Sequence, residues 1–175
     1  MAILNPDHLL EQAARLLEPI SDRTTVRQVD RRRAISSAYY AVFHFTLAAV
    51  ADEFVGRGRL GKVNARYGLV YRSLDHKALE SLCNIARRET PLDKNSKYAK
   101  YVPEGKFEDG IREFASLVVQ LKEKRHSADY DPNHWVQIAD AATAIESARS
   151  AIEIFNRMNS RSRKLFLTLL VFPPR

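Results

Sequence analysis

Apolar residues recur along most of this chain at the three- and four-residue spacing of amphipathic helices. The first such segment opens with Asn5 and Pro6, a favoured pair of residues for the N-cap and first position of a helix. Pro19 marks its end. The same spacing predicts further helices over 28–55, 66–88 with a break near 73–75, 107–128 and 134–158.

The helix predicted over 28–55 differs from the others because its middle is apolar on nearly every face. It starts with the polar run RQVDRRR and becomes almost uniformly apolar from Ala34 to Ala51. Such a helix is buried at the centre of a bundle, and Gly56 and Gly58 are expected to end it. No pair of segments alternates as paired strands do. The predicted fold class is therefore all-α, a bundle of four to six helices.

The chain length of 175 residues suits one domain with an attached tail. We expect the helical domain to occupy 1–158 and the tail to occupy 159–175. The tail is apolar with basic flanks, which fits either a docked segment or an exposed adhesive one. The polar connection over 90–106 is too long for a tight turn, so it is either a functional loop or a flexible one.

The net charge is +7, and its distribution is uneven. Residues 56–66 hold four basic groups and no acid, and residues 157–175 hold five basic groups and no acid. Such clusters attract phosphate-rich partners, although a solvated basic surface with no specific ligand has the same composition. Charge alone therefore leaves nucleic-acid binding open.

A cytoplasmic location is expected. The N-terminal residues lack the basic and apolar regions of a signal peptide, and the most apolar stretch, 34–51, is interrupted by polar residues. The single cysteine, Cys83, cannot form an internal disulfide and sits in an apolar run, so it is expected to be a small buried residue.

Several motifs that would indicate a cofactor or a nucleophile are weak here. Gly56, Gly58 and Gly61 form G-x-G-x-x-G, but a long predicted helix precedes them where a dinucleotide site needs a strand. The nearby acids and histidines at 126, 129, 131 and 134 match no zinc spacing. No metal and no cofactor is predicted.

The stretch EKRHSADYDP, residues 123–132, concentrates polar chemistry at one helix end. Arg125 and Asp129 are four apart and can form an ion pair on one helix face, which His126 flanks. The stretch is either a functional site or a structural ion pair followed by a cap, with Asp131 as N-cap of the next helix and Pro132 at its first position.

Two polar residues on the apolar helix bear on the same question. Tyr40 and His44 are either core residues with one hydrogen-bond partner each or members of a polar network that meets Arg125 across the bundle.

The segments DRRRAISSAYYAVFHF (30–45) and KEKRHSADYDP (122–132) together resemble a prokaryotic subfamily of the HEPN (higher-eukaryote and prokaryote nucleotide-binding) domain. The resemblance covers most of 5–158. It implies an α-helical bundle that forms homodimers. Many family members are metal-independent ribonucleases, often in toxin–antitoxin or defence systems, and several are paired with a minimal nucleotidyltransferase.

The family's ribonucleases carry an arginine followed, after four to six residues, by a histidine. The histidine serves as acid or base and the arginine holds the phosphate that the 2′-hydroxyl attacks. Here the corresponding positions are Tyr130, Asp131 and Pro132, and the next histidine, His134, lies beyond that spacing.

This departure favours a non-catalytic module that binds nucleotide, RNA or a protein partner. Its expected binding residues are Arg125, Asp129, Tyr130, Tyr40 and His44. The alternative is a metal-independent ribonuclease with a variant active site, in which Arg125 and His126 are the catalytic residues.

Overall fold

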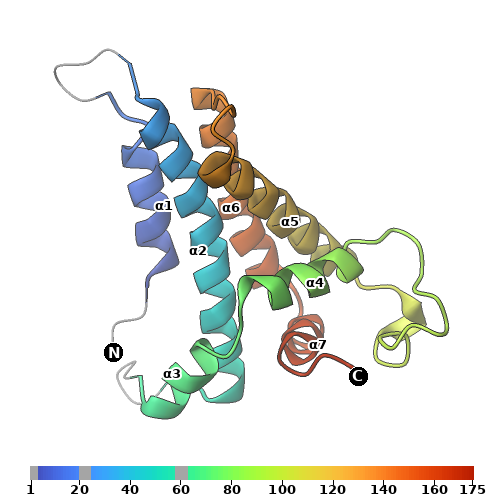
Figure 1. Ribbon diagram of the computed structural model, residues 1–175. Coiled ribbons are helices and arrows are strands. Elements are labelled where there is room, and N and C mark those ends of the chain that lie inside the picture. The colour runs from blue at the N-terminus through green and yellow to red at the C-terminus, as the bar shows by residue number, and fades with distance from the viewer. Residues whose placement is uncertain (1–3, 20–24, 58–62) are drawn as a thin grey trace. The chain divides into compact units, whose positions relative to one another are not determined.

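The computed structural model describes residues 4–19, 25–57 and 63–175. These residues contain seven α-helices, one short 3₁₀ helix and no strand (Figure 1). The predicted all-α class is confirmed. The elements are α1 (Pro6–Arg15), α2 (Gln28–Phe54), α3 (Ala65–Tyr71), α4 (His76–Ala86), η2 (Pro103–Gly105), α5 (Asp109–Tyr130), α6 (Ile138–Arg157) and α7 (Ser160–Val171).

The described residues contain one helix more than the predicted upper limit of six, because two segments add helices. The segment predicted over 66–88 is divided into α3 and α4, and the break expected near 73–75 is confirmed. Asp75 lies at the division and accepts a hydrogen bond from the backbone N–H of Ala78 at 2.7 Å, which caps α4. The tail also forms a helix, α7, whose N-cap is Asn159.

The C-terminal end of the central helix, α2, has an identifiable cause. Gly56 there has a φ of 74°, the left-handed conformation that glycine adopts without a side-chain clash. Its N–H donates to the carbonyl of Ala51 at 3.1 Å, closing the last turn. The expected stop at Gly56 is therefore confirmed, whereas Gly58 and Gly61 lie outside the described residues.

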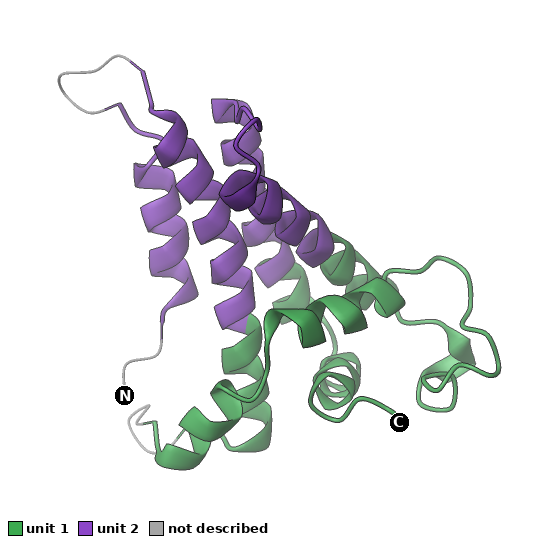
Figure 2. Ribbon diagram, viewed as in Figure 1, with its two compact units in different colours: residues 1–2, 46–116, 153–175 green, residues 3–45, 117–152 purple. Residues whose placement is uncertain are grey.

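The chain divides into two compact units (Figure 2). Among the described residues, unit 1 comprises 46–116 with 153–175, and unit 2 comprises 4–45 with 117–152. Residues 159–175, expected to form a separate tail, belong to unit 1. The domain boundary expected at 158 stays a prediction.

Unit 1 has an aromatic core. The ring centroid of Phe114 on α5 lies 5.0 Å from that of Phe155 on α6 and 5.5 Å from that of Phe166 on α7. All three side chains are buried, as are Leu167, Leu169 and Leu170 of α7. Of the two alternatives for residues 159–175, the structure therefore shows a docked segment.

Cys83, also in unit 1, is buried on α4 as expected. Burial raises the pKa of its thiol well above the ordinary value, because the charged thiolate would lose its hydration. The side chain therefore behaves as a small apolar group in the core.

Unit 2 is closely packed through small side chains. Its buried apolar residues come from α1, the first part of α2, the last part of α5 and most of α6. Alanines dominate on two of these helices: Ala34, Ala38 and Ala41 on α2, and Ala141, Ala144, Ala148 and Ala151 on α6. With no side chain beyond Cβ, these positions let helix backbones approach closely.

Helix α2 is long and apolar enough to cross a membrane by length and composition, contrary to the expectation that polar interruptions exclude this. In its most apolar 18-residue window, 72% of the residues are buried within the protein. The core helix of a bundle has the same property. The cytoplasmic location stays a prediction.

We expect Phe114→Ala to lower the free energy of unfolding by about 3–5 kcal/mol, because it removes a fully buried ring and leaves a cavity. Urea denaturation measures the change. Leu69→Ala is the matched control, since Leu69 is 68% exposed. A loss below about 1 kcal/mol for Phe114→Ala would show that this ring is not part of a packed core.

Candidate functional site

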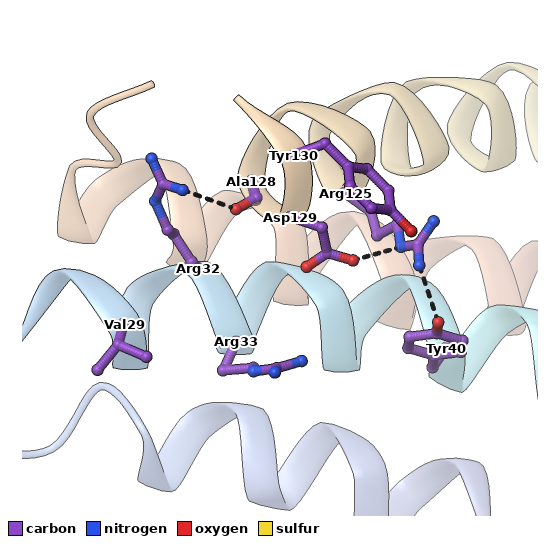
Figure 3. A pocket seen from close by; sticks show the side chains of 8 residues that line it. All are labelled: Val29, Arg32, Arg33, Tyr40, Arg125, Ala128, Asp129 and Tyr130. Carbon is purple, nitrogen blue, oxygen red and sulfur yellow. Dashed lines mark hydrogen bonds and ion pairs between the residues drawn. The ribbon is translucent and has the colours of Figure 1, made fainter. Parts of the chain in front are cut away.

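A cleft of about 420 Å³ opens in unit 2 between helices α2 and α5 (Figure 3). Helix geometry explains why the residues on two of its sides lie together. On α2, positions 29, 33, 36 and 40 are separated by four, three and four residues, so they share one face. On α5, Arg125 and Asp129 are one turn apart. The lining residues are Val29, Arg32, Arg33, Tyr40, Arg125, Ala128, Asp129 and Tyr130.

Arg125 is the residue that joins the two helices. Its Nε lies 2.6 Å from Oδ2 of Asp129, which confirms the ion pair expected from the four-residue spacing. Its Nη2 donates to the hydroxyl of Tyr40 at 3.0 Å. Its guanidinium carbon also lies 5.5 Å from the ring centroid of Tyr40 and 5.3 Å from that of Tyr130, within the range of cation–π attraction.

These contacts keep Arg125 charged. Burial by itself lowers the pKa of the guanidinium, but the neighbouring Tyr40, Asp129 and Tyr130 together raise it by more, so the net shift is upward. Arginine has five N–H donors, and the contacts with Asp129 and Tyr40 do not use all of them. The group can therefore still donate to an anion in the cleft.

The carboxylate of Asp129 has partners on both oxygens. Oδ2 faces Arg125, and Oδ1 accepts a hydrogen bond from the hydroxyl of Ser36 on α2. Its side chain is 17% exposed. Both oxygens of this carboxylate are therefore engaged by side chains of the protein itself.

Arg32 fastens the end of α5 to α2. It donates to the carbonyl oxygens of Ala128 at 3.2 Å and Asp131 at 2.8 Å, and also to that of His134. The last carbonyls of a helix have no partner within it, so this guanidinium satisfies groups that would otherwise need water. Although Arg32 lines the cleft, its guanidinium is therefore used to hold backbone carbonyls at the end of α5.

The chain after α5 is held by the same region of α2. The side-chain amide of Gln28 donates to the carbonyl of Val136 at 2.7 Å and accepts from its N–H at 3.1 Å. Asp131 Oδ1 accepts from the N–H of Asn133 at 2.9 Å, and α6 begins only at Ile138. The helix start expected at 134 is wrong, and so is the alternative in which Asp131 is the N-cap of that helix, because these contacts hold the chain in a non-helical conformation up to Ile138.

Arg33 is the cation in the cleft that remains uncommitted. Its side chain is exposed, and no hydrogen bond or ion pair joins it to another residue in the described ranges. Tyr130, on the opposite side, is 63% exposed. The cleft therefore presents a free guanidinium and an open aromatic face to solvent.

Sequence reasoning did not single out Arg33 or Ser36. A signal for them was present: with Tyr40 they form a polar stripe at helical spacing on a helix that is otherwise apolar. Polar groups along one face of a buried helix need partners from another element, and that requirement would have directed attention to this face.

Four of the expected binding residues, Arg125, Asp129, Tyr130 and Tyr40, line the cleft together. His126 and His44 do not line the cleft, but the ring of each lies near a tyrosine that does. The ring of His126 is 5.1 Å from that of Tyr130, and the ring of His44 is 6.2 Å from that of Tyr40. Within the described ranges, no group of three or more metal-ligating side chains could hold an ion.

No protein-family model, curated protein or solved structure matches this chain. The HEPN resemblance therefore stays a prediction from the two sequence motifs.

We expect Arg32→Met to lower the free energy of unfolding by about 1–3 kcal/mol, because carbonyls at the end of α5 lose their charged donor. Denaturant unfolding measures this, and limited proteolysis should show faster cleavage within 131–137. Arg33→Met is the matched control and should leave both unchanged. Equal effects of the two substitutions would contradict the structural role of Arg32.

Proposed function

We propose that this chain is a non-catalytic HEPN-type module that binds a nucleotide, free or as part of RNA, in the cleft between α2 and α5. The observation that carries the proposal is the uncommitted guanidinium of Arg33, in the same cleft as Arg125 and the exposed ring of Tyr130.

The chemistry of these groups fits the two parts of a nucleotide. Guanidinium groups bind phosphate oxygens through paired hydrogen bonds and a fixed positive charge. An exposed tyrosine ring offers a face on which a base can stack. The cleft volume of about 420 Å³ lies within the usual range for small-molecule sites.

The same geometry supports binding over catalysis. Cleavage of RNA without a metal needs a general base and a general acid near the reacting phosphate. None of the cleft-lining residues is a histidine, and the carboxylate of Asp129 already faces Arg125 and Ser36. The lining therefore offers anion-binding groups without an uncommitted proton acceptor.

We expect the protein to bind nucleoside monophosphates, and Arg33→Gln to weaken that binding about ten-fold or more, since a charged hydrogen bond to phosphate is lost. Isothermal titration calorimetry measures the dissociation constants. Arg149→Gln, an exposed arginine on α6 that does not line the cleft, is the control with the same charge change.

Two results would contradict the proposal. One is the absence of nucleotide binding by folded wild-type protein at millimolar concentration. The other is unchanged affinity in Arg33→Gln, which would remove the cleft from any binding that is observed.

The alternative function, a metal-independent ribonuclease, has one observation in its favour. The ring of His126 lies against Tyr130 at the edge of the cleft, at 5.1 Å. A nuclease would cleave single-stranded RNA in EDTA and leave cyclic-phosphate ends, and His126→Asn would abolish the cleavage. The binding proposal expects no cleavage by wild type. Homodimerisation and a nucleotidyltransferase partner are further predictions of the resemblance.

A further inference from the structure

Residues 87–108 connect α4 and α5. Loops longer than about 12–15 residues are usually functional or disordered, and this connection exceeds that length. This one is held by its own contacts. The N–H of Leu92 donates to the carbonyl of Gly105 at 2.7 Å and closes the loop at its base. Leu92, Tyr98, Val102 and Phe107 are buried. The loop is thus anchored by buried side chains, which favours the functional alternative over the flexible one.

Consecutive turns hold the middle of the loop. The N–H of Ser96 donates to the carbonyl of Asp93 at 2.8 Å, and the N–H of Ala99 donates to that of Ser96 at 2.9 Å. The N–H of Tyr101 donates to the carbonyl of Tyr98 at 3.0 Å. Each of these hydrogen bonds joins residues three positions apart, so the backbone of this stretch is ordered by its own turns.

Three lysines have that spacing. Lys94, Lys97 and Lys100 are all exposed, whereas Tyr98 between them is buried and anchors the loop. No ion pair joins any of the three to a carboxylate in the part of the chain that the structure describes. The nearest carboxylate in sequence, Asp93, accepts a hydrogen bond from the N–H of Asn95 at 2.7 Å. The row therefore keeps its positive charge available.

An aromatic ring extends this row. The ammonium group of Lys100 lies 4.9 Å from the ring centroid of Tyr101, whose side chain is 46% exposed. A row of lysines that ends at an exposed ring matches a polyanion carrying planar groups. In double-stranded nucleic acid the bases are stacked inside, so only a single strand can offer both phosphates and a free base face.

We propose that Lys94, Lys97, Lys100 and Tyr101 form a binding surface for single-stranded nucleic acid. The lysines contact successive phosphates and release counterions, and the ring of Tyr101 stacks with a base. These residues belong to unit 1 and none of them lines the cleft in unit 2, so the surface is a second site beyond the proposed function.

The test uses the full chain and a fluorescently labelled oligouridylate of about twelve nucleotides, with anisotropy measured from about 50 to 200 mM salt. The variant is Lys94→Gln/Lys97→Gln/Lys100→Gln. We expect the slope of log affinity against log salt to become shallower by about 2, because each phosphate contact on a single strand contributes about 0.7.

The matched control is Arg15→Gln/Lys77→Gln/Arg149→Gln, three exposed residues elsewhere whose replacement makes the same change in net charge. It should keep the wild-type slope. If both triple variants change the slope equally, the contribution is one of overall charge and the proposed surface is wrong.

Tyr101→Leu distinguishes the contribution of base stacking from that of phosphate contacts. We expect it to weaken oligouridylate binding about five-fold or more and to leave the binding of inorganic polyphosphate unchanged. Unchanged oligouridylate binding in Tyr101→Leu would overturn the proposal, as would equally tight binding of wild type to polyphosphate or to anionic vesicles. Nucleotide binding in the cleft is measured separately, by titration with mononucleotides. The experiments therefore distinguish a failure of the cleft proposal from a failure of the loop proposal.

Discussion

The contact between α2 and α5 in unit 2 depends on a charge placed where helices usually bury apolar groups. Arg125 and Asp129 are each only 17% exposed, and each has a second partner on α2, Tyr40 and Ser36. A pair of this kind contributes little net stability compared with well-packed apolar residues, because both charges must lose part of their hydration. Losing one partner is costly, since it leaves the other charge uncompensated. Stability alone therefore does not account for this arrangement, which agrees with the anion-binding role that we propose for the cleft.

Three consecutive arginines near the start of α2 have different contacts around this ion pair. Arg31 donates to the carbonyl of Val136 at 3.2 Å, and Arg32 donates to carbonyls at the end of α5. Successive helix positions are about 100° apart, so Arg33 faces another direction and has no partner among the described residues. Two of the three hold the chain after α5 in place, and the third is left for the cleft. The structural contacts of Arg31 and Arg32 thereby hold the two helices between which the side chain of Arg33 remains without a partner in the described ranges.

Interactions within one helix were predictable from the sequence, whereas those between distant segments were at most open alternatives, as for the contact of Tyr40 with Arg125. The cap at Asn5, the stop at Gly56 and the Arg125–Asp129 pair depend only on neighbours in sequence, and the structure confirms them. The hydrogen bond from Ser36 to Asp129 joins residues 93 positions apart, and no local pattern indicates it.

The same distinction explains one helix start that was predicted wrongly and one alternative that was left open. Residues after Pro132 have helical spacing, but α6 begins at Ile138, because Gln28 binds the backbone of Val136 in an irregular segment before the helix. Residues 159–175 gave no sign of whether they would dock, because that depends on the fit of Phe166 against Phe114 and Phe155.

The claim that Arg125 and Asp129 depend on each other for their stability in the protein is tested by a double-mutant cycle. Arg125→Gln, Asp129→Asn and the combined variant are compared by urea denaturation. The account predicts that each single substitution lowers the free energy of unfolding by about 2–4 kcal/mol. It also predicts that the free energy of unfolding of the double variant is no lower than that of the less stable single variant. The effects of the two substitutions are then strongly non-additive. Additive effects would show that the two charges do not depend on each other, and would contradict a structure organised around their contact.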